Sequence, residues 1–93
     1  MKRLLGNVTI ITGGGKGIGF GLAEAFAEQG SNLVITGRTE SRLVAAKEKL
    51  EQMYGIEVLP IVADGADEEA IKNVVAKTIE KFGKINTLVN NAQ

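Results

Sequence analysis

The stretch "TGGGKGIGFG", residues 12–21, follows a short β-branched run at 8–12 and opens an amphipathic segment that begins at Gly17. Glycines between a strand and a helix permit a tight turn that side chains would oppose, and they let a phosphate approach the main chain. The start of the helix then offers free N–H groups and a partial positive charge. The stretch therefore predicts a phosphate-binding turn; the alternative is a glycine-rich turn without a ligand. A P-loop is excluded, because no Gly-Lys pair is followed by Ser or Thr.

Outward from this turn, strand and helix patterns alternate along the chain. We expect strands at 8–12, 32–36, 57–62 and 85–89, and helices at 17–29, 39–54 and 67–82. Three successive strand–helix–strand units predict an α/β fold, a three-layer Rossmann-like half. Its four-stranded parallel sheet should have the order 3-2-1-4, with helices on both faces. Pro60 cannot donate a ladder hydrogen bond, so it predicts an edge position for the third strand.

The apolar residues of each helix recur at a spacing of three or four, and this spacing predicts the face that packs on the sheet. The predicted inner faces are Ile18, Leu22, Ala25 and Phe26 in the first helix, Leu43, Ala46, Leu50 and Met53 in the second, and Ile71, Val74, Val75, Ile79 and Phe82 in the third.

The composition excludes several classes of function. The 93 residues include eleven basic and eleven acidic side chains, so the basic excess of a nucleic-acid binder is missing. There is no cysteine and no histidine, which excludes disulfides, thiolate chemistry, a Ser-His-Asp triad and imidazole zinc ligands. No apolar run approaches the length of a membrane span, and the N-terminus does not read as a signal peptide. We expect a cytoplasmic protein without a metal or membrane partner.

Three motifs together resemble the short-chain dehydrogenase/reductase family. They are "TGGGKGIG" at 12–19, which matches TGxxxGxG, "ADGAD" at 63–67, and "NNAQ" at 90–93, which is similar to Asn-Asn-Ala-Gly. The resemblance implies that Asp64 accepts from the adenine amino group, that Gly65 lines the ring and that Asn90 braces the central strands. It implies cofactor contacts at Gly13, Gly15, Lys16, Gly17, Ile18, Gly19, Arg38, Thr39, Asp64, Gly65, Asn90 and Ala92.

Gln93 departs from the family pattern, because the family has glycine at this position beside the nicotinamide ribose. A side chain there would crowd the cofactor, or the residue marks where a longer sequence was cut. The residues 1–93 are accordingly expected to form a single partial Rossmann domain, truncated after the fourth strand.

The end of the second strand indicates which dinucleotide is bound. Folds of this type that take NAD place Asp or Glu there, about twenty residues past the glycines, to bind the ribose 2′-hydroxyl. Here Gly37 occupies that place and Arg38 follows it. Arginine holds a phosphate through paired N–H donors, and Lys16 in the glycine turn is expected near the same phosphate. The sequence therefore favours NADP(H) over NAD(H). The alternative is that Lys16 and Arg38 are solvated surface charges.

The catalytic residues of the family have no counterpart in this sequence. The family uses Ser, Tyr and Lys, with Tyr-x-x-x-Lys spacing, but Val58 follows the one tyrosine, Tyr54, by four positions. We expect Tyr54 to be a packing residue, and we assign no catalytic residue. The chain is interpreted as the N-terminal dinucleotide-binding part of an NADP(H)-dependent reductase, inactive alone. The alternative is a non-catalytic nucleotide-binding or self-associating module that uses an exposed fourth-strand edge. Under either interpretation we expect a homo-oligomer formed through an exposed fourth-strand edge.

Overall fold

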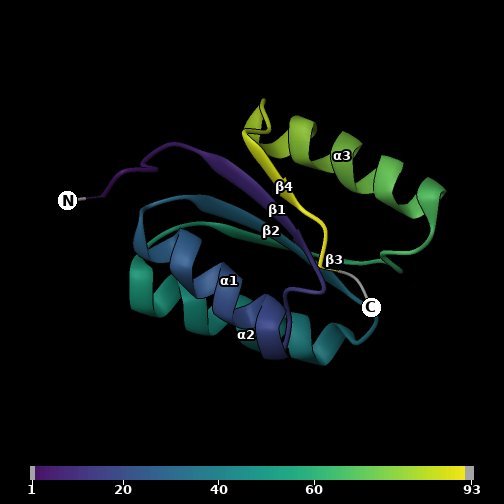
Figure 1. The fold of residues 1–93 in the computed structure, drawn as a ribbon, viewed down its shortest axis with the longest axis horizontal. Helices are drawn as coiled ribbons and strands as arrows, with labels where there is room; N and C mark the ends of the chain where they lie inside the picture. Colours follow the sequence, from purple (N-terminus) through teal and green to yellow (C-terminus); the bar gives the residue numbers. More distant parts are fainter. Residues whose placement is uncertain (1, 92–93) are drawn as a thin grey trace.

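The computed structural model describes residues 2–91 of the chain. Four strands form one parallel sheet in the order β3-β2-β1-β4. Helices α1 and α2 cover one face of the sheet and α3 covers the other (Figure 1). The elements are β1 (Val8–Thr12), α1 (Gly17–Glu28), β2 (Asn32–Gly37), α2 (Glu40–Tyr54), β3 (Val58–Val62), α3 (Glu68–Phe82) and β4 (Thr87–Val89). This architecture confirms the predicted fold class, strand order and layering.

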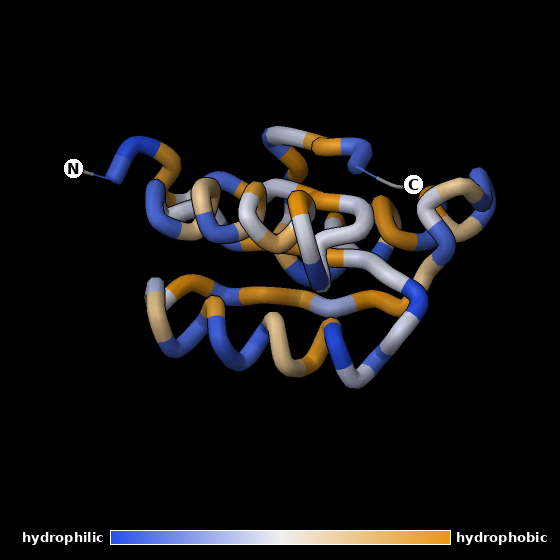
Figure 2. Tube along the Cα trace, turned by 60° about the horizontal axis from the view of Figure 1, so that its bottom comes forward, coloured by the Kyte–Doolittle hydropathy of each residue, from blue (hydrophilic) through white to orange (hydrophobic). Residues whose placement is uncertain are grey.

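The core lies in two clusters, one on each face of the sheet. Every residue of β1 is buried, and so are the four central residues of β2, because both strands have neighbours on each side and helices above and below. The strands carry long hydrophobic stretches, whereas the helices alternate between hydrophobic and polar residues (Figure 2). None of the helices within residues 2–91 is long and apolar enough to cross a membrane.

Capping is seen at the end of α1 and at the start of α3, but no side chain caps the start of α2. At the end of α1, Gly30 has a φ of +95°, and Ser31 N donates to Phe26 O at 3.1 Å, which is a Schellman motif. At the start of α3, Asp67 Oδ1 accepts from the N–H groups of Glu69 and Ala70. Thr39 occupies the N-cap position of α2, but its side chain makes no capping hydrogen bond.

Strand β3 is an edge strand, as the proline predicted. Leu33 N donates to Glu57 O and Ala63 N donates to Gly37 O, each at 2.9 Å, so the alternate residues Val58, Pro60 and Val62 turn their backbone groups away from β2. Pro60 has no N–H to offer on that side.

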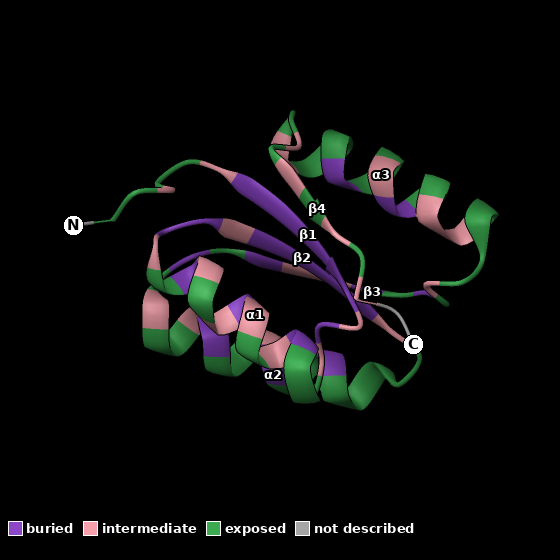
Figure 3. Cartoon of the chain, in the orientation of Figure 1, coloured by how far each residue is buried: buried purple, intermediate pink, exposed green. Residues whose placement is uncertain are grey.

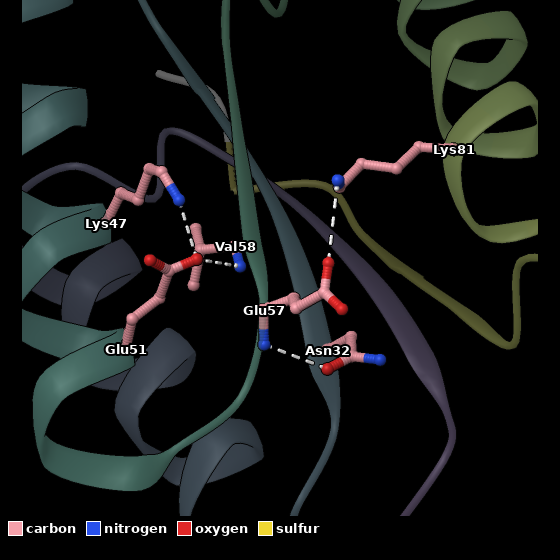
Figure 4. A network of polar contacts seen from close by, with 6 residues as sticks. All are labelled: Asn32, Lys47, Glu51, Glu57, Val58 and Lys81. Carbon is pink, nitrogen blue, oxygen red and sulfur yellow. Dashed lines mark hydrogen bonds and ion pairs between the residues drawn. The ribbon is translucent and has the colours of Figure 1, made fainter.

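The N–H of Val58 is occupied by a side chain. Glu51 Oε2, on α2, accepts from Val58 N at 2.9 Å and from Lys47 Nζ at 2.6 Å (Figure 4). From the other face of the sheet, Lys81 Nζ on α3 lies 3.5 Å from Glu57 Oε2. Two of the three outward positions of β3 are thereby closed to strand addition, one by a carboxylate and one by proline.

The face of α1 that packs on the sheet differs from the predicted one. The buried residues of α1 are Gly19, Ala23 and Ala27, whereas Ile18 is 70% exposed and Ala25 is exposed. Along α1 as a whole, buried positions alternate with half-buried and exposed ones (Figure 3). Small side chains bring this helix close to β1 and β2, and the larger residues Leu22 and Phe26 are only partly buried at the flanks. The prediction for Ile18 and Ala25 was wrong because it centred the inner face on the large residues of the helix, whereas the buried face is centred on Gly19, Ala23 and Ala27.

Two further residues of the predicted inner faces are exposed. Met53 is 55% exposed, and Tyr54 packs against the core beside it. Ile79 is 46% exposed, whereas Thr78 is fully buried and donates to Val74 O at 2.7 Å. Because the hydroxyl of Thr78 has its hydrogen-bond acceptor within its own helix, this polar residue can be buried in the core. The hydrophobic pattern had assigned that core position to Ile79.

Candidate functional site

A cavity of about 470 Å³ lies at the carboxyl ends of β1, β2 and β3. In open α/β sheets this is where ligands bind, and the volume lies within the range of roughly 300–1,000 Å³ that small-molecule sites occupy. Its walls come from the turn before α1, the end of β2, the start of α2 and the loop after β3. The lining residues are Gly13, Gly15, Lys16, Gly17, Ile18, Thr36, Gly37, Arg38, Thr39, Arg42, Leu43, Ala63, Asp64, Gly65 and Asn91.

The glycine turn forms one wall, and its glycines have different reasons to be there. Gly13 and Gly17 have φ values of +70° and +60°, which side chains rarely adopt. Gly19 is required by packing: a Cβ on it would lie 1.9 Å from Gly13 O. Gly14 N donates to Thr36 O at 3.0 Å, which ties the turn to β2. The turn is therefore held against the sheet, with the start of α1 directed at the cavity.

Nine of the twelve predicted cofactor residues line this cavity together. They are Gly13, Gly15, Lys16, Gly17, Ile18, Arg38, Thr39, Asp64 and Gly65. Gly19 lies just behind the turn, within α1, and Asn90 also lies outside the lining. Ala92 is outside the described residues. The exposed side chain of Ile18, unexpected for a core residue, is explained by its place in the cavity wall.

The two asparagines after β4 have different positions. Thr12 Oγ1 donates to Asn90 Oδ1 at 3.1 Å and accepts from Asn91 N at 2.8 Å. This pair of hydrogen bonds joins the end of β4 to the end of β1, which is the bracing arrangement predicted for Asn90. Asn91 lines the cavity, and its Nδ2 lies 2.8 Å from the position that a Cβ on Gly19 would occupy.

The cavity carries a positive balance. Its lining includes three cations, Lys16, Arg38 and Arg42, and one carboxylate, Asp64, which leaves a net charge of +2. Arg38 Nη2 lies 3.3 Å from Asp64 Oδ1, and the two side chains are 72% and 46% exposed. Within residues 2–91, neither Lys16 nor Arg42 forms an ion pair.

Asp64 is held in its ionised form by its neighbours. The N–H of Ala66 donates to Asp64 Oδ1 at 2.9 Å, and this hydrogen bond, with the charge of Arg38, lowers the pKa of Asp64 against the opposing effect of partial desolvation. An ionised carboxylate accepts hydrogen bonds and donates none. Asp64 can therefore accept from an amino group that enters the cavity, which is the role predicted for it.

Sequence reasoning missed several lining residues, of which Thr36, Arg42 and Asn91 carry polar groups. Thr36 is fully buried, and its Oγ1 is the one buried side-chain polar atom of the described residues without a hydrogen-bond partner. Arg42 follows Arg38 by one helical turn of sequence, a spacing that a search for basic residues near the second strand would have found. Asn91 was passed over in favour of its neighbour Asn90.

These residues fit a dinucleotide. The glycine turn and the start of α1 offer backbone N–H groups to a pyrophosphate, and the turn leaves space where side chains would fill it. Gly65 and Asp64 offer a surface and an acceptor for an adenine ring. Lys16, Arg38 and Arg42 line the same cavity as Gly37, which ends β2 without a carboxylate.

The chain belongs to the short chain dehydrogenase family, whose profile matches residues 7–93. Among curated proteins, it is 52% identical over 94 residues to a 12alpha-hydroxysteroid dehydrogenase from Clostridium sp., an alignment that covers 95% of this chain and 36% of that protein. It is 38% identical to an L-fucose dehydrogenase from Bos taurus, covering 97% of this chain and 32% of that protein.

Solved structures show the same fold. The chain superimposes on L-sorbose reductase from Gluconobacter frateurii, complexed with NADPH and L-sorbose, with a TM-score of 0.94 and 37% identity, covering 99% of this chain and 35% of that chain. It superimposes on an NAD⁺-bound xylitol dehydrogenase with a TM-score of 0.91 and 33% identity, covering 98% and 35%. The chain therefore spans about a third of the length of the relatives that it matches.

Proposed function

We propose that this chain is the dinucleotide-binding part of an NADP(H)-dependent oxidoreductase of the short chain dehydrogenase family. In the whole protein, NADPH would transfer a hydride to a carbonyl carbon while the oxygen takes a proton, giving an alcohol and NADP⁺; the reverse reaction oxidises the alcohol. The chain's own residues bind and orient the adenosine end of the cofactor. Hydride chemistry is supplied by the nicotinamide.

The observation that carries the preference for NADP(H) is the charge around the end of β2. Three cations line the cavity into which the end of β2 opens, and Gly37 stands where an NAD-specific site has its carboxylate. Asp64, the one acidic lining residue, is paired with Arg38. A dianionic 2′-phosphate is favoured by such a wall, whereas the 2′-hydroxyl of NAD would find no acceptor on Gly37. The relatives include both an NADPH complex and an NAD⁺ complex, so the proposed preference depends on this chain's own residues.

Among the described residues, the cavity wall contains no tyrosine. Tyr54, the one tyrosine of the chain, lies at the end of α2, and its hydroxyl donates to Glu24 Oε2 at 3.1 Å. Burial together with this hydrogen bond raises the pKa of Tyr54. A catalytic tyrosine needs a lowered pKa and a place beside the nicotinamide. Carbonyl reduction by the 93-residue chain is expected to be undetectable.

The experiment that tests this function is a calorimetric titration of the chain with NADPH and then with NADH. Saturable binding that favours NADPH supports the proposal. A folded chain that binds neither dinucleotide would contradict it, and a chain that binds NADH more tightly would contradict the preference. Turnover of a carbonyl substrate that copurifies with the chain would overturn the expected lack of activity.

A cytoplasmic location, with which the cysteine-free sequence agrees, stays a prediction.

A second candidate is self-association through β4, and the contrast between the two edges of the sheet favours it. Within residues 2–91, β4 pairs only with β1, and Leu88 at its centre is 51% exposed. Unlike β3, this edge has no proline or capping carboxylate, and an uncovered edge strand is a template for pairing. Two copies joined here would form one continuous sheet. Sedimentation of the chain and of Leu88→Lys tests this: a dimer that the substitution dissociates supports it, and a monomeric chain contradicts it.

A further inference from the structure

We propose that Arg42, at the start of α2, is a determinant of cofactor specificity, whose guanidinium contacts the 2′-phosphate of the bound dinucleotide. The inference rests on the proposed function and assigns a residue to it that neither the sequence motifs nor the glycine turn contains. It follows from how α2 is anchored, from the charges around Arg42 and from the way Arg38 is already engaged.

The position of Arg42 is determined by its neighbour Leu43. Leu43 is 1% exposed, and its side chain packs between Gly15 and Gly37. A Cβ added to either glycine would lie 3.3 Å from Leu43 Cδ2. The first turn of α2 is therefore packed between the glycine turn and the end of β2. A Cβ on Gly15 would also lie 3.9 Å from Arg42 Cβ, so the arginine side chain leaves the backbone directly beside the glycine turn.

The electrostatic setting of Arg42 is unfavourable in the absence of an anion. Arg42 is the third residue of α2, and a cation in the first turn of a helix opposes the helix dipole. Glu40 shares that turn but forms no ion pair with Arg42. Lys16 lines the same cavity, and it too is free of ion pairs within residues 2–91. Lys16 and Arg42 are therefore two cations of one cavity that no carboxylate within residues 2–91 neutralises, and a phosphate bound between them would be stabilised by both.

Arg38 by contrast has a carboxylate beside it. Its Nη2 lies 3.3 Å from Asp64 Oδ1, so a phosphate that binds Arg38 has to share or replace this contact, at a small cost because both side chains are exposed. Arg42 has no such competitor, and a guanidinium can offer two parallel N–H donors to one phosphate. The sequence attributed the preference for NADP(H) to Lys16 and Arg38 alone. We infer that Arg42 contributes to it as well.

Lys49 provides a matched control on the same helix. Arg42 lines both the main cavity and an adjoining shallow groove, whereas Lys49 lines the groove only, with its Nζ 5.3 Å from the centre of the Phe20 ring. Removing either residue takes away one positive charge at a similar exposed place on α2. Only the removal of Arg42 takes away a donor in the cavity.

The test measures the affinities for NADPH and NADH in the wild-type chain, Arg42→Met and Lys49→Met, with circular dichroism as a check on folding. A charge-assisted hydrogen bond at an exposed site corresponds to about a tenfold change in affinity. We expect Arg42→Met to weaken NADPH binding about tenfold and to leave NADH binding within about twofold. Lys49→Met should leave the ratio of the two affinities unchanged, and Arg42→Lys should retain part of the preference.

The outcomes separate this inference from the proposed function. If the wild-type chain binds NADPH no better than NADH, the proposed preference fails and the role of Arg42 fails with it. If the wild-type chain favours NADPH and a folded Arg42→Met variant keeps the same ratio, only the inference about Arg42 is overturned. An equal effect of Lys49→Met would also overturn it, because a general loss of positive charge would then explain the result.

Discussion

Arg38 and Asp64 follow the ends of two neighbouring parallel strands, β2 and β3, and their side chains meet at 3.3 Å in the wall of the cavity. The sequence motifs assigned these residues to opposite ends of an adenosine group, the arginine to the 2′-phosphate and the aspartate to the adenine. Both side chains are largely exposed, and an exposed pair of this kind contributes little to stability. A bound nucleotide can therefore replace the contact at small cost.

Arg38→Asp is predicted to abolish any preference for NADPH over NADH. The substitution removes a donor to the phosphate and places a second carboxylate close to Asp64, which repels the dianion even though Arg42 and Lys16 remain. Calorimetric titration with both dinucleotides measures the ratio of the two affinities. An unchanged ratio in a folded variant would remove Arg38 from the phosphate site.

Two glycines of α1, two residues apart, are predicted to respond in opposite ways to alanine. A Cβ at Gly19 would collide with Gly13 O, so Gly19→Ala should distort the glycine turn and cost about 3 kcal/mol or more of the free energy of unfolding. A Cβ at Gly21 meets nothing within 4 Å, so Gly21→Ala should stabilise the helix by about 0.5–1 kcal/mol. Urea denaturation of both variants measures the difference. Equal effects would contradict the close packing at Gly19.

Thr36→Val is predicted to leave the free energy of unfolding unchanged or to raise it. The hydroxyl of Thr36 is buried without a partner within residues 2–91, and an isosteric methyl removes that cost. The matched control is Thr12→Val on β1, in register with Thr36, whose hydroxyl contacts Asn90 and Asn91. Thr12→Val should lower the free energy of unfolding by about 1–2 kcal/mol. A loss of similar size in Thr36→Val would show that its hydroxyl has a partner in solution.

Glu51→Ala is predicted to destabilise the chain and to promote association through the edge of β3. The substitution leaves the N–H of Val58 without its acceptor and the ammonium of Lys47 without its carboxylate. The expected loss is about 1–2 kcal/mol in the free energy of unfolding. Glu48→Ala, an exposed position on the same helix, is the control and should change little. Chemical denaturation measures stability and light scattering measures association; equal behaviour of the two variants would contradict the role of Glu51.

The same carboxylate predicts a dependence of stability on pH. Partial burial opposes the ionisation of Glu51, but the hydrogen bonds from Lys47 and from Val58 N–H outweigh it, so the pKa of Glu51 is lowered on folding. A group with a lowered pKa contributes stability above its unfolded pKa, which is about 4.3 for Glu, and loses that contribution as the pH falls further. Glu51→Gln should therefore flatten the fall in unfolding free energy between about pH 5 and pH 3. An unchanged slope would contradict this.

The sequence by itself determined the order of the elements and most of the cavity wall. Hydrophobic runs bounded by glycines predicted the strands, Pro60 predicted the edge position of β3, and Asp67 predicted the start of α3. These signals are local, since each depends on the backbone preferences of a few adjacent residues. The glycine turn is local in the same sense, because its conformation follows from Gly13 and Gly17.

Only the tertiary structure decided which side chains meet. The buried face of α1 consists of Gly19, Ala23 and Ala27, whose small size lets the helix approach the sheet closely. The sizes of the apolar residues in this one helix do not reveal how closely it packs. Arg42 joins the cavity because Leu43 packs between two glycines that are 22 residues apart in sequence, Gly15 and Gly37. Contacts of this kind depend on the complementary shapes of elements that are distant in the sequence, so they are defined only when the layers pack together.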